Sequence, residues 1–412
     1  MRVFTTLLSP AEARARYLAA LSPAPLGAET VPLDQALDRV LTADLVAGED
    51  LPPFDRSTVD GFAVRAADVE QGGESAPARL RLVGEVRMGE ATALRLGAGE
   101  TVRVPTGGML PPGADAVVIQ ERSRVLDETV EVHRPVRPGE NMISRGEDVR
   151  AGDTVLRAGR RLRPQDLGIL AGLGHARVAV RLRPTVAIIS SGDEIVPPDR
   201  PAGPGQIRDM NTFSLGGLVR HAGGIPVPFP ILPDDLATVH GALRRAVEAH
   251  DIVLISGGSS VGEHDVVVDA IRALGPPGIV VHGVAIRPGK PTVLAVAGNR
   301  PIVGLPGNPV SAMVIFDVFV RPVLAALRGS TEERPPGTRV RARAGRAIAA
   351  PTEREDHVRV ALEARDGDLW AHPLPAKSGL LTSMVRADGI VVVPPGGRIA
   401  EGETVEVDLL EG

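Results

Sequence analysis

The sequence predicts a multidomain protein of the α/β plus β class, in which a doubly wound, mostly parallel α/β domain accompanies β-rich domains. Its 412 residues, at about 150 residues per domain, suffice for two to four domains. Continuous apolar runs alternate with helical patterns between residues 184 and 329, and shorter alternating segments lie on either side. The 47 glycines and 37 prolines imply many short elements joined by turns.

These patterns divide the chain into four predicted units. Residues 1–50 together with 146–183 form a helical and extended linker domain, and residues 51–145 form a β-rich, barrel-like domain. Residues 184–329 form the α/β domain. Residues 330–412 begin with a proline-rich linker and form a small C-terminal β-barrel.

The N-terminal region is predicted to be helical, and β-strands follow it. Ser9 and Glu12 have the spacing of a capping box, so a helix is expected to about Ala20. A second helix is expected from Asp34 to about Leu41. Short alternating segments then predict strands at Arg79–Arg87, Thr101–Val104, Ala116–Gln120, Val130–Val132, Thr154–Leu156 and Ala176–Val180.

The elements of the α/β domain are the most distinct. Buried strands are predicted at Thr185–Ser190, Ile225–Ile231, Asp251–Ile255, Ile279–Ala285 and Pro301–Val303. Helices between and after them are predicted at Thr212–His221, Leu236–Ala249, Asp265–Leu274 and Pro309–Leu327. The C-terminal barrel has predicted strands at Arg339–Ala344, Val358–Glu363, Leu369–His372, Gly389–Val393 and Thr404–Leu409.

Composition excludes several classes of protein. The chain has no cysteine, which rules out disulfide scaffolds, thiolate metal sites and a cysteine nucleophile. A net charge of −5 and nine aromatic residues in all argue against a nucleic-acid partner. The most apolar helix-length run, Ser311–Val320, is about half as long as a bilayer requires, and no signal peptide is apparent. We therefore expect no membrane association and a cytoplasmic location.

Four predicted strands of the α/β domain run into unusual residues at their carboxyl ends, where ligands bind in open α/β sheets. The first two are followed by small residues and carboxylates, the third by Arg287 and Lys290, and the fourth by a Gly/Pro turn. Such glycines let amides approach phosphate oxygens, carboxylates hold Mg²⁺, and the cations neutralise anions. The residues thus indicate a phosphate-bearing ligand with Mg²⁺, although each motif alone is also compatible with an ordinary turn or helix cap.

The lysine count adds weight to one of these turns. Of the 46 basic residues only Lys290 and Lys377 are lysine. A chain that uses arginine almost everywhere retains a compact ammonium at Lys290 inside a Pro-Gly-Lys-Pro turn, which indicates a close-fitting anion. Lys377 has two equal interpretations, a surface lysine or a second ligand of the site.

Neighbouring patterns exclude other chemistries. Neither the P-loop pattern nor G-x-G-x-x-G occurs at these turns, which argues against P-loop ATPases and Rossmann dehydrogenases. The histidines lack zinc-site spacing, and no G-x-S-x-G elbow occurs. Outside the α/β domain, the loop Leu51–Val64 combines two aromatics with two carboxylates, and Thr106 and Asp148 follow in further polar turns.

Six motifs in this order resemble the molybdopterin molybdenumtransferase family, whose members are similar to the E domain of gephyrin. They are Phe54–Val64, Arg145–Asp148, Ser191–Glu194, Ser256–Asp265, Arg287–Pro291 and Gly304–Ser311. The resemblance implies an elongated homodimer of four-domain subunits with the active site at the dimer interface. It also implies a Mg²⁺-dependent reaction in which molybdate is inserted into adenylylated molybdopterin and AMP is released. Residues 184–329 would be the molybdopterin-binding domain.

The resemblance implies roles for individual residues. The molybdate is expected to contact Arg287 and Lys290, with Ser311 and Ser378 as hydroxyl donors. Mg²⁺ is expected to be held by Glu194, Asp234 and Asp265, with Asp193 behind them. Substrate contacts are also expected from Gly257, Gly258, Ser259, Pro306 and Asn308. The pterin or a reacting oxygen is expected to be oriented by Asp60, Thr106 and Asp148.

Two departures and two alternatives accompany the resemblance. Arg287 stands where the family more often has lysine, and Met142–Ser144 is apolar where relatives can be arginine-rich. The alternatives are a non-catalytic scaffold and a molybdopterin adenylyltransferase, an activity that uses a similar α/β domain. The upstream adenylyltransferase is also a candidate partner of the enzyme.

Overall fold

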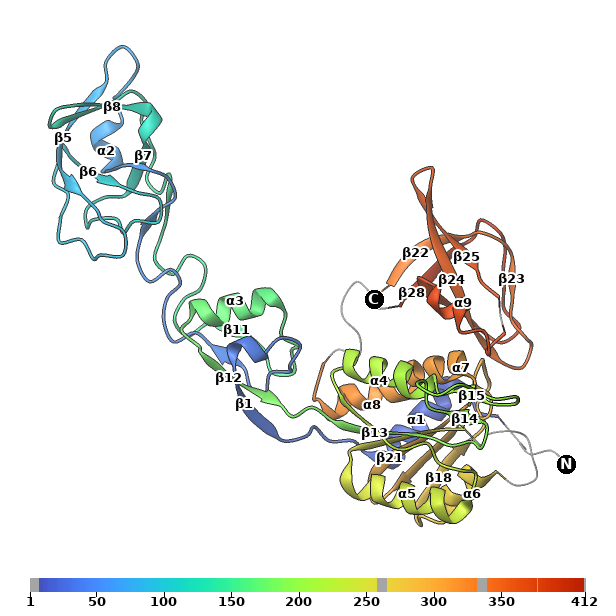
Figure 1. The fold of residues 1–412 in the computed structure, drawn as a ribbon. Helices are drawn as coiled ribbons and strands as arrows, with labels where there is room; N and C mark the ends of the chain where they lie inside the picture. The colour runs from blue at the N-terminus through green and yellow to red at the C-terminus, as the bar shows by residue number, and fades with distance from the viewer. Residues whose placement is uncertain (1–6, 258–264, 332–338, 376, 411–412) are drawn as a thin grey trace.

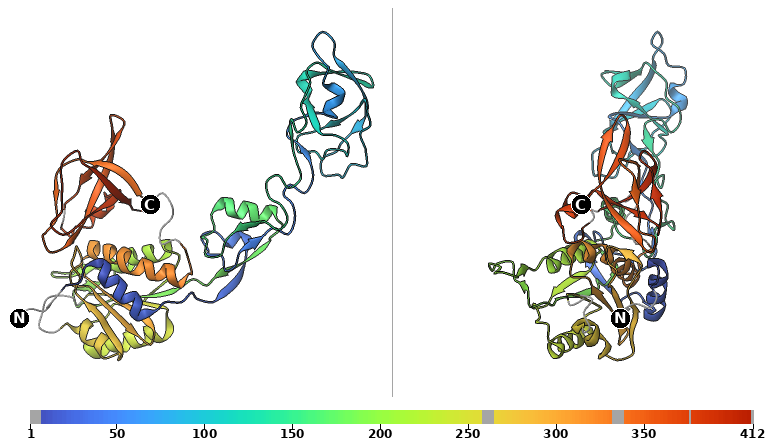
Figure 2. Two further views of the ribbon diagram at one scale, coloured as in Figure 1. Left: turned by 180° about the vertical axis from the view of Figure 1, so that it is seen from behind. Right: turned by 90° about the vertical axis from the view of Figure 1, so that its right-hand side faces the viewer.

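The computed structural model describes residues 7–257, 265–331, 339–375 and 377–410. The molecule is elongated (Figures 1 and 2). The distal domain (residues 51–145) lies at one end, and a narrow arm (residues 26–50 and 146–183) connects it to the α/β domain (residues 184–329). The C-terminal domain (residues 339–410) lies over the α/β domain at the other end.

The α/β domain is built on one six-stranded sheet in the order β16-β13-β17-β21-β20-β18. Every strand is parallel to its fellows except β20, which forms antiparallel pairs with both of its neighbours, so the predicted mostly parallel sheet is confirmed. The strands are β13 (Thr185–Ser190), β16 (Ile225–Pro228), β17 (Ile252–Ser256), β18 (Pro277–His282), β20 (Val293–Ala297) and β21 (Arg300–Leu305).

Helices cover both faces of this sheet, as a doubly wound domain requires. One face packs against α4 (Asn211–His221), α7 (Pro309–Ile315) and α8 (Arg321–Leu327), and the other against α5 (Leu236–Ala249) and α6 (Val266–Arg272). The side chains between the layers are almost all aliphatic. The four predicted helices of this region are therefore confirmed.

A continuous apolar helical stretch, Pro309–Leu327, joins α7 and α8 through a π-helical segment, Phe316–Val320. It is long and apolar enough to cross a membrane, which exceeds the shorter apolar run expected from the sequence. However, 78% of it is buried inside the protein. Its apolar composition is therefore accounted for by the core of the α/β domain.

The N-terminal helix α1 (Pro10–Leu21) also belongs to this core. Ser9 and Glu12 form the predicted capping box. Ala13, Tyr17 and Leu21 are buried against the sheet, and the hydroxyl of Tyr17 donates to the carbonyl of Ile302 over 3.3 Å. Helix α1 therefore packs with the α/β domain and not with the rest of the predicted unit of residues 1–50 and 146–183, because its apolar face covers the sheet.

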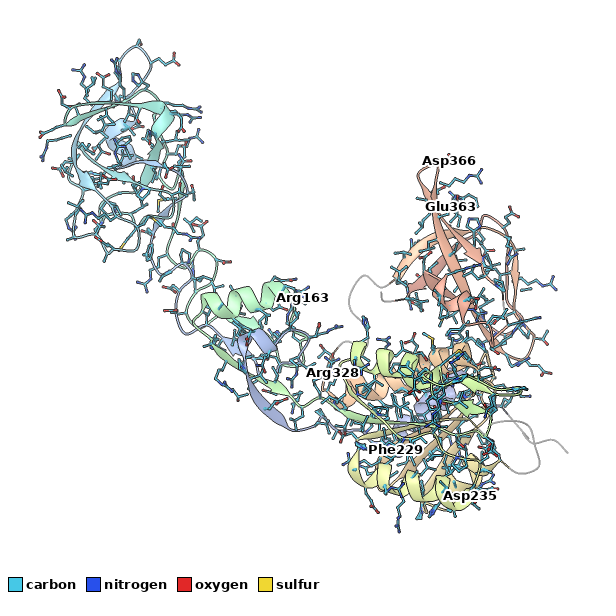
Figure 3. The ribbon with its side chains drawn as sticks, viewed as in Figure 1. Arg163, Phe229, Asp235, Arg328, Glu363 and Asp366 are labelled. Carbon is cyan, nitrogen blue, oxygen red and sulfur yellow. The ribbon has the colours of Figure 1, made fainter. Side chains whose placement is uncertain are left out.

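The arm consists of two short antiparallel pairs and one helix. β1 (Ala28–Pro32) pairs with β12 (Arg177–Arg181), and β2 (Leu45–Val46) pairs with β11 (Thr154–Leu156). Helix α3 (Pro164–Gly172) packs on them, and Figure 3 labels Arg163 at its start. We did not predict α3, because its two glycines weaken the helical pattern.

The predicted helix Asp34–Leu41 is wrong. Only a 3-10 turn, Leu33–Gln35, forms there. Asp38 has a φ of +63°, a left-handed conformation that ends a helix, and Val40 and Leu41 form β-bridges to Arg161 and Val180 instead. The backbone of this segment thus joins the two segments of the chain that form the arm.

The distal domain contains an open six-stranded sheet in the order β7-β4-β6-β5-β9-β8, consistent with the predicted barrel-like β domain. Its strands are β4 (Gly61–Val64), β5 (Ala78–Glu85), β6 (Glu100–Val104), β7 (Ala116–Ile119), β8 (Ser123–Leu126) and β9 (Thr129–Val132). Smaller elements near it are β3 (Arg56–Ser57), α2 (Ala66–Val69), the 3-10 turn Gln120–Arg122 and β10 (Met142–Ile143).

The C-terminal domain is the predicted small barrel. Five strands close on one another in the order β24-β25-β22-β28-β26, and β26 returns to β24. They are β22 (Arg339–Ala344), β24 (Glu355–Arg365), β25 (Asp368–Pro373), β26 (Gly389–Val393) and β28 (Thr404–Leu409). The remaining short elements of the chain are β14 (Ile195–Val196), β15 (Ile207–Arg208), β19 (Ile286–Arg287), β23 (Ile348–Ala349), α9 (Thr382–Val385) and β27 (Arg398–Ile399).

Candidate active site

The predicted phosphate loop begins where two neighbouring parallel strands end. The amide of Ser191, just after β13, donates to the carbonyl of Ser256 at the end of β17 over 2.9 Å. Gly257 follows with a φ of +119°, and a Cβ atom there would lie 1.8 Å from the carbonyl oxygen of Ser191. Backbone conformation and space therefore both require glycine. Gly258 and Ser259, predicted to continue this loop, lie outside the described residues.

Three predicted carboxylates gather beside this crossing. The hydroxyl of Ser191 donates to Asp234 over 2.7 Å, and the amide of Asp234 donates to Asp193 over 3.3 Å. The carboxylate of Glu194 turns back over Gly192, where a Cβ atom would lie 2.5 Å from it. All three carboxylates are exposed, so oxygen ligands are available at the carboxyl end of β13.

Asp265, the remaining predicted magnesium ligand, caps the N-terminus of α6. Its carboxylate accepts hydrogen bonds from the amides of Val267 and Val268, both at 3.1 Å. Burial raises the pKa of Asp265, and the hydrogen bonds from the two backbone amides act in the opposite direction. A cation bound nearby would therefore stabilise the ionised form of this half-buried acid.

The donor set suits Mg²⁺ in kind. Within the described ranges, no group of three or more histidine or acidic side chains is close enough to hold a metal ion alone. Mg²⁺ commonly takes only one or two protein carboxylates, and it completes its coordination with water and substrate phosphate. Glu194 and Asp234, beside the predicted phosphate loop, fit that mode of binding.

A buried polar network beneath these loops was missed by the sequence analysis. Asp209 is 8% exposed and accepts hydrogen bonds from the hydroxyl of Ser190 over 3.2 Å and from Thr212, through its amide at 3.1 Å and its hydroxyl at 2.6 Å. The hydroxyls of Ser190 and Ser256 lie 3.5 Å apart. The network ties the ends of β13 and β17 to the start of α4. Its acid follows a two-residue strand, β15, which leaves no apolar run to reveal it.

The same layer holds the Gly/Pro turn after β21. The side-chain amide of Asn211 donates to the carbonyl of Gly307 over 2.9 Å. Within this turn Pro306 is buried and Asn308 is exposed. The turn is therefore fixed from below while one predicted polar side chain remains accessible.

The C-terminal domain brings a loop to this turn. A Cβ atom on Gly379 would lie 3.5 Å from the side-chain oxygen of Asn308, so the neighbouring Ser378 lies close to the predicted site. Ser311, the other predicted hydroxyl donor, is 3% exposed within α7. Ser378 is therefore the more accessible of the two. Lys377 is exposed beside it.

The two predicted cations lie on one loop at the junction with the C-terminal domain. β19 pairs in parallel with β24, and Arg287 forms an ion pair of 3.4 Å with Asp356 across this pairing. Burial raises the pKa of Asp356, and the charge of Arg287 opposes that shift. Lys290 is exposed three residues further on, after Gly289, whose φ is +120°.

In the distal domain the structure pairs two predicted residues. Asp60 accepts hydrogen bonds from the amide of Thr106 over 2.7 Å and from its hydroxyl over 3.0 Å. These bonds, led by that of the amide, lower the pKa of Asp60. Both residues are exposed, so an ionised carboxylate with a fixed orientation faces solvent.

Replacing Thr106 with valine tests this pair. Thr106→Val keeps the hydrogen bond from the backbone amide but removes the one from the hydroxyl. We therefore expect the pKa of Asp60 to rise part of the way towards its ordinary value of 3.8. Because the folded-state pKa is lowered, the stabilisation is present above pH 3.8 and is lost as pH falls through the folded value. A carboxyl-carbon NMR titration measures the shift. An unchanged midpoint would contradict it.

One chain does not bring all the predicted residues together. Asp148 is exposed where the arm meets the distal domain, and its amide donates to Leu51 over 3.1 Å. The domain that carries Asp60 and Thr106 lies at the far end of the arm from the loop of Lys290 (Figure 2). Asp60 and Lys290 therefore do not share a site within a single chain.

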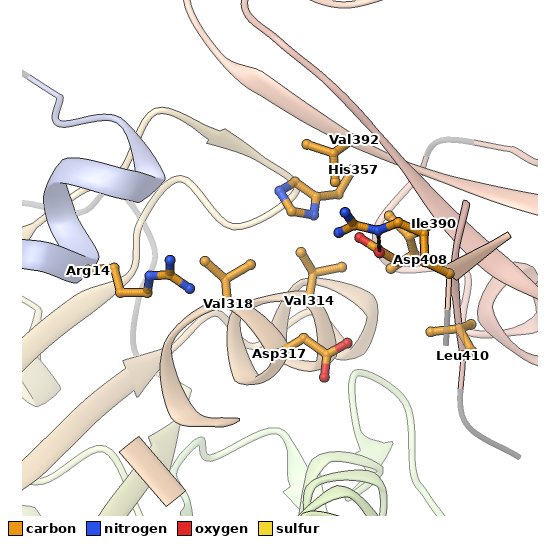
Figure 4. A pocket seen from close by; sticks show the side chains of 10 residues that line it. Arg14, Val314, Asp317, Val318, His357, Ile390, Val392, Asp408 and Leu410 are labelled. Atoms are coloured by element: carbon orange, nitrogen blue, oxygen red, sulfur yellow. Dashed lines mark hydrogen bonds and ion pairs between the residues drawn. The ribbon is translucent and has the colours of Figure 1, made fainter. Parts of the chain in front are cut away.

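Two cavities lie between the helices of the α/β domain and the barrel, with volumes of about 320 and 510 Å³. Figure 4 shows the first, where Arg14 and His357 point towards a floor that includes Val314 and Val318. None of the predicted site residues lines either cavity. The predicted site is thus distinct from these two cavities.

Comparison with known proteins decides the family. Three family models match in order: the MoeA N-terminal region (domains I and II) over residues 8–174, a probable molybdopterin binding domain over 187–326, and the MoeA C-terminal region (domain IV) over 341–410. A molybdopterin molybdenumtransferase 2 of Mycobacterium tuberculosis is 36% identical over 92% of this chain and 94% of its own. The chain belongs to the molybdopterin molybdenumtransferase (MoeA) family.

Other members of the MoeA family agree with this. The molybdopterin molybdenumtransferase of Bacillus subtilis is 32% identical, over 93% of this chain and 90% of its own. Two crystal structures of molybdopterin biosynthesis MoeA proteins from Pyrococcus horikoshii superpose with TM-scores of 0.81 and 0.84, at 34% and 32% identity. They cover 99% and 98% of this chain and all of their own. The similarity thus extends over all the domains described above.

Proposed function

We propose that this MoeA-family enzyme inserts molybdate into adenylylated molybdopterin and releases AMP, in a reaction that uses Mg²⁺. The observation that supports it most directly is the arrangement at one end of the α/β domain. The Gly257 crossing and the carboxylates lie at the ends of β13 and β17, and the loop of Arg287 and Lys290 lies at the junction with the barrel.

The proposed reaction requires positive charge at the site, because it brings two anions together. Two unit negative charges about 4 Å apart repel by roughly 4 kcal/mol at an effective dielectric constant near 20, and multivalent anions repel more strongly. Arg287 and Lys290 would bind the oxyanion. Glu194 and Asp234 would hold Mg²⁺ directly, with Asp265 as the third predicted acid of the site, and the ion would neutralise phosphate charge when bound. The amide of Gly257 would contact the phosphate.

We further propose that the active site is completed by a second subunit. The distal domain, which contains Asp60 and Thr106, and the adjoining end of the arm, which contains Asp148, lie away from the α/β domain of their own chain (Figure 2). In a two-fold homodimer, the distal domain of one chain can supply them to the α/β domain of the other. There Asp60, held ionised by Thr106, would orient the pterin or a reacting oxygen.

A subunit-mixing experiment tests this arrangement. At limiting molybdate, Asp60→Ala and Lys290→Ala chains are each expected to retain only a small fraction of wild-type activity alone. Co-expressed with different tags, they should form mixed dimers that have one intact site each, so random assortment should restore about a quarter of wild-type turnover. If both residues acted within one chain, no activity would return, and the shared site would be disproved. Co-expression of two Lys290→Ala chains is the control.

The reaction itself is tested by AMP release. Added molybdate and Mg²⁺ should release AMP from adenylylated molybdopterin, and EDTA should stop it. Pyrophosphate release from ATP and molybdopterin would instead indicate an adenylyltransferase, and no turnover of either substrate would indicate a scaffold. The expected cytoplasmic location and contact with the upstream adenylyltransferase belong to the same proposal, and co-purification of the two proteins tests the latter.

A further inference from the structure

The joint between the arm and the α/β domain is organised around one buried arginine. Arg328 follows α8 and is 8% exposed, and Figure 3 labels it where the arm meets the α/β domain. One guanidinium nitrogen donates to the carbonyl of Ala222, after α4, over 2.8 Å. Another donates to the carbonyl of Asp38, in the arm, over 2.7 Å. A single planar group therefore links the two domains directly.

The surroundings of this guanidinium are built to receive it. Gly223 has a φ of +78°, and a Cβ atom there would lie 2.4 Å from the guanidinium carbon of Arg328. Asp38 also adopts a positive φ, +63°, and its side chain is held by Arg161 at 2.9 Å. Both backbone segments thus take a less common conformation where they present a carbonyl to Arg328 or make room for it.

Backbone hydrogen bonds support the same joint. The amide of Leu26, at the base of the arm, donates to the carbonyl of Leu327 over 2.8 Å, and the amide of Thr331 donates to Gly159 over 3.1 Å. These backbone hydrogen bonds hold the base of the arm, whereas the side chain of Arg328 reaches a separate segment of the arm at Asp38. The fork of the guanidinium can reach two acceptors in fixed directions, which a lysine ammonium does not reproduce.

We infer that Arg328 is a positioning residue, which fixes the angle of the arm and thereby the place to which Asp60 and Thr106 are delivered. The inference rests on the proposed function, because the angle matters for turnover only if the distal domain completes an active site. It assigns to Arg328 no contact with substrate. A displacement of about 1 Å at reacting groups is enough to lower a rate by roughly 100-fold.

The absence of cysteine allows a direct measurement of the joint. Spin labels on Gln165→Cys in α3 and Arg244→Cys in α5, both exposed positions, report the distance between arm and α/β domain. Labelled protein is diluted with unlabelled protein, so that only distances within one chain contribute. We expect Arg328→Met to broaden the distance distribution at least twofold, and Arg328→Lys to broaden it less. The matched control is Arg321→Lys, at a 7% exposed arginine whose ion pair is to Asp317 in the same helical stretch.

Turnover provides the second measurement. We expect Arg328→Met to lower kcat about tenfold and to leave the KM for molybdate within twofold, since the loop of Arg287 and Lys290 belongs to the α/β domain and not to the arm whose angle would change. An unchanged distance distribution in folded Arg328→Met protein would overturn the inference, and so would a broadened distribution with wild-type kcat. If the wild type releases no AMP, the proposed function fails, and the distance distribution alone then decides whether Arg328 fixes the arm.

Discussion

Replacing Lys290 with alanine is expected to lower kcat/KM for molybdate by about 10- to 100-fold, because a hydrogen bond to a charged group contributes roughly 1.5–3 kcal/mol. Lys290 is exposed, and its loop is held in place by its own backbone. Its carbonyl accepts from Val284 over 3.0 Å, and the carbonyl of Gly289 accepts from the amide of Thr292 over 3.2 Å and from its hydroxyl over 2.6 Å. The substitution should therefore remove charge without collapsing the loop. AMP release at limiting molybdate measures the effect.

Two companion variants separate charge from shape. Lys290→Arg keeps the charge but replaces a compact ammonium with a wide planar group, so we expect an intermediate rate if the anion fits closely. Lys377→Ala removes the only other lysine, which is exposed beside Ser378, and decides between its two interpretations. Normal turnover by Lys290→Ala at low molybdate would refute the assignment of the anion site.

Gly257→Ala should have the second large effect. A Cβ atom at this position would lie 1.8 Å from a backbone oxygen, that of Ser191, and the φ of +119° disfavours any side chain. The strained conformation alone costs about 1–3 kcal/mol. Relief requires the crossing of the two loops to open, which would displace Asp234, held by Ser191. A misplacement of about 1 Å at reacting groups lowers a rate by roughly 100-fold, so we expect turnover to fall by at least about that factor. We also expect a lower midpoint of urea unfolding.

A nearby glycine provides the matched control. Gly307 lies in the turn after β21, where no atom would come within 4 Å of an added Cβ. Gly307→Ala should therefore leave the unfolding midpoint unchanged within error. If both variants unfolded at the wild-type midpoint and turned over normally, the tight crossing at Gly257 would have no functional weight.

The sequence reveals those parts of this protein whose surroundings leave a regular pattern. The strands of the α/β sheet are continuous aliphatic runs because both of their faces are covered, so β13 and β17 were predicted within one residue at each end. Strand β20 was not predicted, since it follows directly on the Lys290 loop and precedes a two-residue turn to β21. The helix predicted at Asp34–Leu41 failed because its backbone pairs with a segment more than a hundred residues away.

The candidate site shows the same limit. Motifs identify chemical classes, such as the carboxylates after β13 and the cations after β19, because residue type alone determines what they can bind. Spatial pairings are not encoded locally. The contact between the Ser378 loop and Asn308, and the burial of Asp209 beneath β13, arise only when separate domains or elements meet. Arg328 is equally inconspicuous as one arginine among many.

The docking of α1 has a consequence for biosynthesis. Tyr17 bonds to Ile302, 285 residues later in the chain, and this helix leaves the ribosome long before its docking surface exists. At synthesis rates of about 5–20 residues per second, the delay is roughly 15–60 s. Throughout that interval the apolar side of α1 remains without its partner strands and is open to capture by chaperones. The α/β domain can be completed only after translation has passed its last helix, so nascent chains that stall earlier should be especially sensitive to proteolysis.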